Sequence, residues 1–409
     1  MLLPVIHSFT CERIHYFMNS YYTVNIHTDQ IRINQFKSQN TKYICTLTFD
    51  NKIYWYTEQQ KIHAFGIIVK KKVKFFKGNY KDLEEMRRLI GCKIIFDGIV
   101  SLYKCNNQIG EGADSKVFKV EDNINKSLWA LKCLERKDDF YQEIRMHQNL
   151  EHNHIIQFKE YFQGEQYYYI IMELMGGQTL SKLLEKNLIT THQQCKVIIQ
   201  ALLSALVYLK NEGIIHRDIK PANIMFAQSG RLDSLKLVDF NFAIRQNDTN
   251  VQPILCGMNT APEALQDNPI YSDKMDVYSC GAILYKLYSG EDIHPIRYMQ
   301  ESNVFYDILR NGSIDFKVLE KANTPNQAIR LIKSMLEIDP FKRVNAQEAL
   351  QLDYFQNESL SPTEKRSRFQ QRYQNESLKI GITTDFEINI DQDAKSANIR
   401  KMEIHHHHH

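Results

Sequence analysis

One segment, at residues 214–225, constrains this chain more than any other; it reads IIHRDIKPANIM. Asp218 and Asn223 follow its apolar pair, and Asp239 ends a later apolar run at residues 235–238. If these side chains converge, one carboxylate can orient a hydroxyl group, while the amide oxygen and the second carboxylate can hold Mg²⁺, which prefers oxygen ligands. Because an unrelated chain would rarely carry this string by chance, it predicts a site where a hydroxyl group meets a metal ion.

Two weaker signals lie upstream of that segment. A glycine-containing turn between predicted strands lets backbone N–H groups approach phosphate oxygens; it comprises Ile109, Gly110, Glu111 and Gly112, with Val117 on the next strand. Lys132 follows Ala130 in an apolar strand and needs a partner there, for which Glu143 on the next predicted helix is the nearest candidate. In isolation, each signal has a simple alternative: a hairpin turn and a surface lysine.

The composition excludes several classes of protein. The 409 residues carry a net charge of +3, which is too balanced for a general nucleic-acid binder. The eight cysteines contain no C-x-x-C pair, which argues against zinc ribbons and disulfide scaffolds and favours a reducing, cytoplasmic location. No apolar run approaches the roughly 18 residues of a membrane span. We therefore expect no transmembrane segment and no signal peptide.

Strand and helix patterns divide the chain into three parts. Alternating residues at 21–78 predict short strands, and a helical period at 81–94 places Leu83, Met86, Leu89 and Ile90 on one face, with Gly91 to end the helix. Together they predict a small α+β unit over residues 1–97. Further strands are expected at 103–134, with helices following up to 356, most clearly at 191–211, 274–289, 303–310 and 326–337. Residues 357–409 are polar and are expected to be largely disordered.

The motifs appear in the order of a known family, because residues 103–356 resemble a eukaryotic protein kinase domain. The resemblance also includes Ala261-Pro262-Glu263, Asp276 and Arg343. It implies an α+β, bilobal kinase fold with a β-rich N-lobe and a helical C-lobe. It also implies ATP and Mg²⁺ as cofactors and proteins as substrates. Lys220 is typical of the serine/threonine class, and residues 235–243 resemble the calcium/calmodulin-dependent kinase group.

The resemblance implies a role for each motif residue. Asp218 orients the substrate hydroxyl as catalytic residue, and Lys220 offsets charge on the γ-phosphate. Lys132, held by Glu143, grips the α- and β-phosphates. Asn223 and Asp239 hold the metal. Around the adenine, the family register places Val117, Ala130 and Met225 on its two faces, Met172 as gatekeeper, and Glu173 and Met175 in the hinge.

Two further expectations concern the scaffold of this kinase-like region. The resemblance pairs Glu263 with Arg343 and makes Asp276 a support of the catalytic-loop backbone. It also disfavours a small-molecule kinase, because Glu263 and Arg343 shape a platform for polypeptides.

The sequence departs from the family at several positions. Ser115 and Asn241 replace glycines, and Asn is the residue besides Gly that best tolerates positive φ. The segment before Ala261 is short, with Ile254 where a phosphorylated Thr or Ser is usual. Thr249 is the candidate for a substitute phosphosite, although a Thr in a polar loop usually has no such role. We therefore hypothesise that activity does not rely on the standard loop phosphorylation, and a catalytically weak pseudokinase scaffold is the alternative reading.

Residues 1–97 resemble a pleckstrin-homology fold, a small β-barrel-like domain with a C-terminal helix. Met86 stands where that fold usually has Trp. Five lysines form a strip that could face anionic lipid: Lys70, Lys71, Lys72, Lys74 and Lys77. A solvated strand face is the favoured reading, so we expect at most weak membrane or protein contact through this domain.

Overall fold

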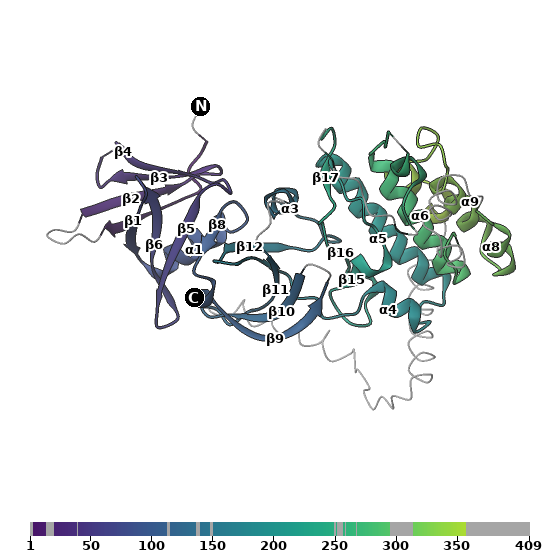
Figure 1. Ribbon diagram of the computed structural model, residues 1–409, viewed down its shortest axis with the longest axis horizontal. Helices are drawn as coiled ribbons and strands as arrows, with labels where there is room; N and C mark the ends of the chain where they lie inside the picture. Colours follow the sequence, from purple (N-terminus) through teal and green to yellow (C-terminus); the bar gives the residue numbers. More distant parts are fainter. Residues whose placement is uncertain are drawn as a thin grey trace, which may run out of the picture. The chain divides into compact units, whose positions relative to one another are not determined.

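The computed structural model describes residues 3–13, 20–38, 40–112, 115–135, 140–147, 150–248, 251, 257, 259–266, 268–294 and 314–356 (Figure 1). Within residues 140–147 it describes the backbone, but not the side chains of Phe140, Gln142, Glu143 or His147. The expected helix at 303–310 and the expected disordered tail at 357–409 lie outside the described residues.

The described part of the N-terminal region forms an antiparallel sheet of seven strands. The alternating sequence predicts the strands after residue 20, but not the first strand or the sheet order. Inward side chains on these strands are buried while their neighbours are more exposed, as Tyr22, Val24 and Ile26 show. The strands neighbour one another in the order β4-β3-β2-β1-β7-β6-β5. Their bounds are β1 His7–Arg13, β2 Ser20–Ile26, β3 Gln30–Gln35, β4 Thr41–Thr46, β5 Lys52–Glu58, β6 Lys61–Val69 and β7 Lys72–Gly78.

Helix α1, Tyr80–Ile90, follows the seventh strand. Asn79 caps its start by accepting a hydrogen bond from the backbone N–H of Lys81. The predicted apolar face is buried, but Arg87 is buried with it. Gly91 ends the helix with an ordinary φ of −53°, and a Cβ atom there would lie 2.5 Å from the Lys159 carbonyl oxygen. This glycine is therefore needed for close backbone approach rather than for a left-handed turn.

Strand β8, Ile95–Asp97, joins the N-terminal sheet to the strands of the kinase-like region. It pairs in parallel with β5 on one side and with β12, Phe158–Gln163, on the other. Phe96 of β8 packs edge-on against Trp55 and Phe162, with ring centroids 5.4 and 5.6 Å away. The result is one thirteen-stranded sheet with a hydrophobic core shared across the junction.

A buried ion-pair cluster reinforces this junction. The Arg87 guanidinium of α1 forms two hydrogen bonds to the Glu160 carboxylate of β12, at 2.7 and 2.8 Å, and lies 3.0 Å from Asp122. Lys159 also pairs with Asp122, at 2.8 Å, and the Tyr103 hydroxyl donates to Glu160. Burial disfavours the Asp122 carboxylate, but Arg87 and Lys159 outweigh that cost and lower its pKa. Each buried charge is thereby compensated.

The kinase-like region continues with three antiparallel strands, a short helix and two more strands. These are β9 Tyr103–Glu111, β10 Ser115–Asp122, β11 Leu128–Glu135, α3 Phe140–His147, β12 and β13 Tyr167–Met172, after the single turn α2 Ile99–Leu102. The strands expected at 103–134 are confirmed.

Helices dominate the chain after β13, as the sequence predicts. The long α5, His192–Asn211, starts at a capping box in which Thr191 and Gln194 exchange hydrogen bonds, and α6, Asp273–Ser289, is buried along most of its length. The remaining elements are α4 Leu180–Glu185, β14 Ile214–Ile215, η1 Pro221–Asn223, β15 Ile224–Phe226, η2 Leu232–Ser234, β16 Leu235–Leu237, β17 Ile244–Arg245, η3 Pro262–Leu265, α8 Lys317–Lys321, α9 Asn326–Met335, α10 Ala346–Leu350 and α11 Asp353–Gln356. None of the described helices is long and apolar enough to cross a membrane.

We predict that Arg87→Ala lowers the free energy of unfolding by about 3–5 kcal/mol, because it leaves Glu160 and Asp122 buried without their main cation. Denaturant-induced unfolding monitored by circular dichroism would measure this loss. The control is Arg88→Ala, since Arg88 is 69% exposed and pairs only at the surface with Glu85, so a change below about 1 kcal/mol is expected. Equal losses for the two variants would contradict the structural role of the cluster.

Candidate active site

The segment that carries Asp218 is held in place by a carboxylate from a different helix. Asp276 of α6 accepts hydrogen bonds from the backbone N–H groups of His216, at 2.7 Å, and Arg217, at 2.9 Å. Arg217 has a φ of 65°, a strained backbone conformation that these bonds help to hold. Burial raises the pKa of Asp276 to about 7, while the two backbone donors act in the opposite direction. The expected support of the catalytic-loop backbone is confirmed.

Three predicted site residues meet directly beyond this support. Lys220 Nζ lies 2.8 Å from Asp218 Oδ2, and the Asn223 amide nitrogen donates to the same oxygen at 2.7 Å. Asn223 also donates to the Asp218 carbonyl at 2.9 Å. This orientation leaves the amide oxygen of Asn223 on the opposite side, where it can serve a cation.

Asp239 is positioned by the antiparallel pair β15–β16. Ile224 pairs with Leu237, and the Val238 N–H donates to the Asn223 carbonyl at 2.9 Å, so the two predicted metal ligands are on adjacent backbone segments. Phe240, which is buried, packs on His216 at 4.7 Å between ring centroids. Burial lowers the pKa of His216 to about 4, so this ring is neutral at pH 7.

Lys132 reaches this segment from β11. Its Nζ lies 3.3 Å from Asp239 Oδ1 and 2.7 Å from Asn241 Oδ1, although these residues are 107 and 109 positions away in the chain. The lysine side chain is 10% exposed and the aspartate side chain 36%, so the pair lies at an opening rather than in the core. Positive φ falls on Asp239, at 63°, and not on Asn241. The reason inferred from sequence for an Asn at position 241 is therefore wrong.

The glycine turn and the predicted adenine residues lie on strands next to Lys132. Gly110 pairs with Val117, which in turn is opposite Lys132, and Ala130 is opposite Met172. The turn itself is closed by a hydrogen bond from the Gly112 N–H to the Ser115 carbonyl. Ile109 and Glu111 are exposed beside it.

The predicted hinge follows β13. The Glu173 N–H donates to the Gln157 carbonyl, so a purine contact at this residue would have to use its carbonyl oxygen. Its carboxylate pairs with Lys236 at 2.9 Å, a partner that sequence reasoning missed because Lys236 lies in an apolar strand. Met175 and Met225 are half-buried.

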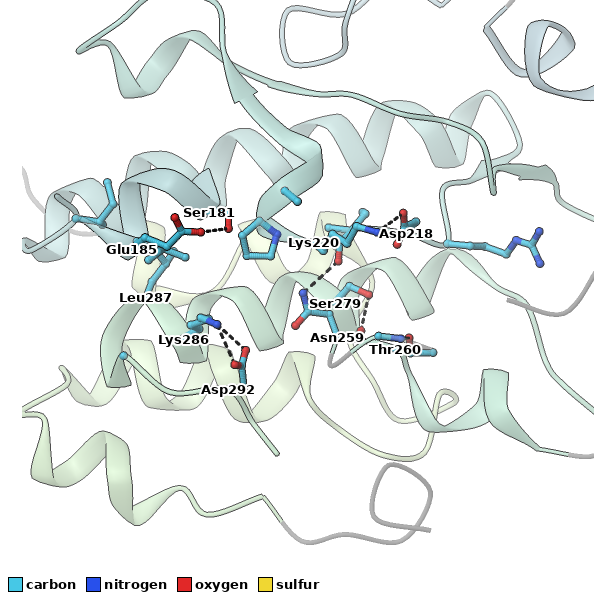
Figure 2. Close-up of a pocket in the computed structure, with 18 of the residues that line it drawn as sticks. Ser181, Glu185, Asp218, Lys220, Asn259, Thr260, Ser279, Lys286, Leu287 and Asp292 are labelled. Atoms are coloured by element: carbon cyan, nitrogen blue, oxygen red, sulfur yellow. Dashed lines mark hydrogen bonds and ion pairs between the residues drawn. The ribbon is translucent and has the colours of Figure 1, made fainter. Parts of the chain in front are cut away.

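An open pocket of about 530 Å³ adjoins Asp218 and Lys220 (Figure 2). Residues of α4, the catalytic loop and α6 contribute to its walls. Asn259 connects the catalytic loop to α6. Its side-chain amide donates to the Ile219 carbonyl, and its backbone carbonyl accepts from the Ser279 hydroxyl. The pocket provides a surface beside Asp218 on which a substrate chain could lie.

The expected Glu263–Arg343 pair is confirmed. The two guanidinium nitrogens lie 2.5 and 2.9 Å from the two carboxylate oxygens, and both side chains are buried. Arg343 also donates to the carbonyls of Glu337, Ile338 and Lys274. This hydrogen-bonded ion pair anchors η3, which comes shortly after the pocket residues Asn259 and Thr260 in the chain, to the segment between α9 and α10.

Some predicted positions cannot be placed. The side chain of Glu143 lies outside the described part of the chain, as do Thr249 and Ile254. Among the residues that are described, no group of three or more His, Cys, Asp or Glu side chains could hold a metal ion. The predicted ligand pair of Asp239 and Asn223 is not a group of that kind, because one of its members is an amide.

Comparison with known proteins agrees with this geometry. Residues 103–355 match the protein kinase domain family, which is more than half of the chain, so the chain belongs to that family. ATP, Mg²⁺ and protein substrates are general features of the family. No family match covers the N-terminal strands, and their pleckstrin-homology-like assignment stays a prediction.

Three relatives illustrate the resemblance. A probable myosin light chain kinase of Dictyostelium discoideum is 31% identical over 260 residues, 61% of this chain and 82% of the relative. A calcium/calmodulin-dependent protein kinase type II of Caenorhabditis briggsae is 28% identical over 264 residues, 62% and 49% of the two chains. Serine/threonine-protein kinase 33 of Mus musculus is 25% identical over 320 residues, 74% and 64% of the two chains. The resemblance to the calcium/calmodulin-dependent group is thus confirmed, although the chain spans only about half the length of one such relative.

We predict that Asp276→Asn lowers protein phosphorylation by roughly tenfold or more. The two carboxylate oxygens of Asp276 each accept from one backbone N–H group, whereas an asparagine has only one oxygen and would point its NH₂ group at the other N–H. The lost hydrogen bond costs about 1–3 kcal/mol in loop stability. Initial rates at saturating nucleotide would measure the loss. Asp273→Asn is the matched control in the same helical turn, because Asp273 pairs with Lys210 and not with the loop. An unchanged rate for Asp276→Asn would refute the supporting role.

Proposed function

We propose that this chain is an ATP- and Mg²⁺-dependent serine/threonine protein kinase. The observation that carries the proposal is the contact between Lys132 and Asp239, which lie 107 residues apart in the chain and 3.3 Å apart in space. A lysine and a carboxylate brought together at an opening suit a ligand that carries both phosphates and a divalent cation. The hydrogen-bonded group of Asp218, Lys220 and Asn223 supplies the remaining chemistry.

On this proposal, Asp218 accepts a hydrogen bond from the hydroxyl group of the substrate and aims its oxygen at the γ-phosphate. Its partners fit that task, because Asn223 fixes the carboxylate and Lys220 lies 2.8 Å away. The hydroxyl oxygen forms a new bond to the γ-phosphorus while the P–O bond to the leaving ADP breaks, and the hydroxyl proton passes to Asp218. The Lys220 ammonium offsets the negative charge on the transferred group. Positioning and charge neutralisation account for the catalysis, with no covalent intermediate on the protein.

The nucleotide and metal would lie between Lys132 and the β15–β16 segment. Lys132 suits the α- and β-phosphates, and the oxygen atoms of Asp239 and Asn223 suit Mg²⁺. Bound Mg²⁺ would neutralise phosphate charge during transfer. Glu143 remains the proposed partner of Lys132. The proposed nucleotide pocket comprises Ile109, Gly110, Glu111, Gly112, Val117, Ala130, Met172, Glu173, Met175 and Met225.

The wider organisation is part of the same proposal. We assign residues 103–356 to a bilobal kinase domain, residues 1–97 to a pleckstrin-homology-like domain and residues 357–409 to a tail, and propose a cytoplasmic location. In the N-terminal domain, Lys74 packs over the Tyr43 ring at 4.9 Å, while the other lysines of the strip are exposed. Weak contact with a membrane or a protein is the proposed use of that exposed strip.

We predict that Asp218→Asn lowers transfer of γ-phosphate from ATP to Ser/Thr-containing protein substrates by about 10²–10⁴-fold, because the general base is lost. The measurement is incorporation of labelled phosphate at matched protein concentrations. Asp233→Asn, which changes an exposed carboxylate paired with Arg231, is the matched control and should retain full activity. Equal incorporation by wild type and Asp218→Asn would remove the enzyme assignment.

The alternative is a pseudokinase that acts as a scaffold, and the same assay separates it from the enzyme. If wild type transfers no phosphate and gains no thermal stability with Mg²⁺ and ATP, the scaffold reading is favoured. Thermal stabilisation without transfer would show that the chain binds nucleotide, and further protein substrates would then have to be assayed.

We also predict that Thr249→Ala retains activity. In the family, the arginine at the position of Arg217 contacts the phosphorylated loop residue. Here Arg217 donates its Nε–H to the Phe242 carbonyl at 2.7 Å and lies over the Tyr271 ring at 5.0 Å. These contacts hold the arginine without a phosphoresidue. Activity that is abolished in Thr249→Ala and restored in Thr249→Glu would show dependence on loop phosphorylation.

A further inference from the structure

Asn241 makes the shortest described contact of Lys132. Its Oδ1 accepts a hydrogen bond from Lys132 Nζ at 2.7 Å, against 3.3 Å for Asp239 Oδ1. The contact joins β11 to the segment that follows β16 across the opening assigned above to the nucleotide. At this position the kinase resemblance expects Gly, which has no side chain and could not form such a bond.

The backbone does not explain why Asn stands here. Asn241 does not have positive φ, so its backbone conformation is open to any residue, whereas the positive φ falls on Asp239. Asn241 is also exposed, so packing does not require it. The lysine contact is the feature of this side chain that distinguishes it from a generic turn residue.

The neighbours of Asn241 are fixed by other means. Phe240 is buried against His216, and the Phe242 carbonyl accepts from Arg217. The Asn241 side chain therefore adds a tie from this anchored segment to the phosphate-gripping lysine, and with it to the strand that carries Lys132.

The chemistry of the acceptor suits a positioning role. An amide oxygen orients an ammonium group without cancelling its charge, so Asn241 adds no negative charge to that of the Asp239 carboxylate beside Lys132. A carboxylate in the same place would compete with phosphate for that charge.

We propose that Asn241 is a positioning residue that holds Lys132 and Asp239 in the arrangement that receives the phosphates and the metal. This inference rests on the proposed function, because it assumes that Lys132 binds phosphate. The nucleotide then meets a lysine that is already oriented, rather than one that must be ordered at the time of binding.

The test is the dissociation constant of purified full-length protein for Mg²⁺-ATP and, separately, for adenosine, measured by isothermal titration calorimetry. We expect Asn241→Ala to weaken Mg²⁺-ATP binding by roughly fivefold to tenfold, which is less than a buried hydrogen bond to a charged group would give because Asn241 is exposed, and to leave adenosine binding unchanged. Asn241→Asp should weaken Mg²⁺-ATP binding as well, with adenosine again unaffected, because its charge opposes phosphate.

The matched control is Gln228→Ala, which removes another exposed amide that accepts from a cation, Arg231, outside the site. It should change neither constant. The inference is overturned if Asn241→Ala binds Mg²⁺-ATP as tightly as wild type or more tightly, or if it loses ATP and adenosine in equal proportion. Wild type that binds neither ligand would instead overturn the nucleotide-binding function itself.

Discussion

Two carboxylates, Asp122 and Glu160, are buried in the strands of the kinase region, and the cation that compensates both comes from outside that region. Arg87 of α1 forms two hydrogen bonds to one and an ion pair with the other. A buried charge without a partner costs several kcal/mol, so these strands and the N-terminal helix are mutually dependent. The strand pairings of β8 and the approach of Gly91 to the Lys159 carbonyl act at the same junction.

A related arrangement, in which a buried charged side chain bonds to backbone groups, organises the active site. Asp276 holds the catalytic loop through backbone N–H groups, and Arg343 holds η3 through Glu263 and three backbone carbonyls. These anchoring residues are buried, whereas Asp239 remains partly open to solvent. This difference in burial has a physical reason. Hydrogen bonds made by the anchoring residues are stronger in a low-dielectric interior, whereas a residue that meets a ligand must be accessible.

Much of this could be predicted from the sequence. Asp218 and Asn223 stand in a string too specific to arise by chance, and Asp239 ends a later apolar run. The strands and long helices follow from alternation and helical period. Arg87 could not be found in that way, because a basic residue on an amphipathic helix usually faces solvent and its partner Glu160 lies 73 positions away. The contact of Asn241 was missed for a related reason: sequence reasoning considered only its backbone freedom, and the contact depends on tertiary distance.

The shared sheet also affects how the protein can be divided. A fragment that began at residue 103 would lose β8, and the β12 backbone groups that now pair with it would face water. An unpaired strand edge of this kind is a template for self-association. A kinase domain cut from its N-terminal strands would therefore be prone to aggregate. The first hundred residues thus shield a strand edge of the kinase domain, besides forming a structure of their own.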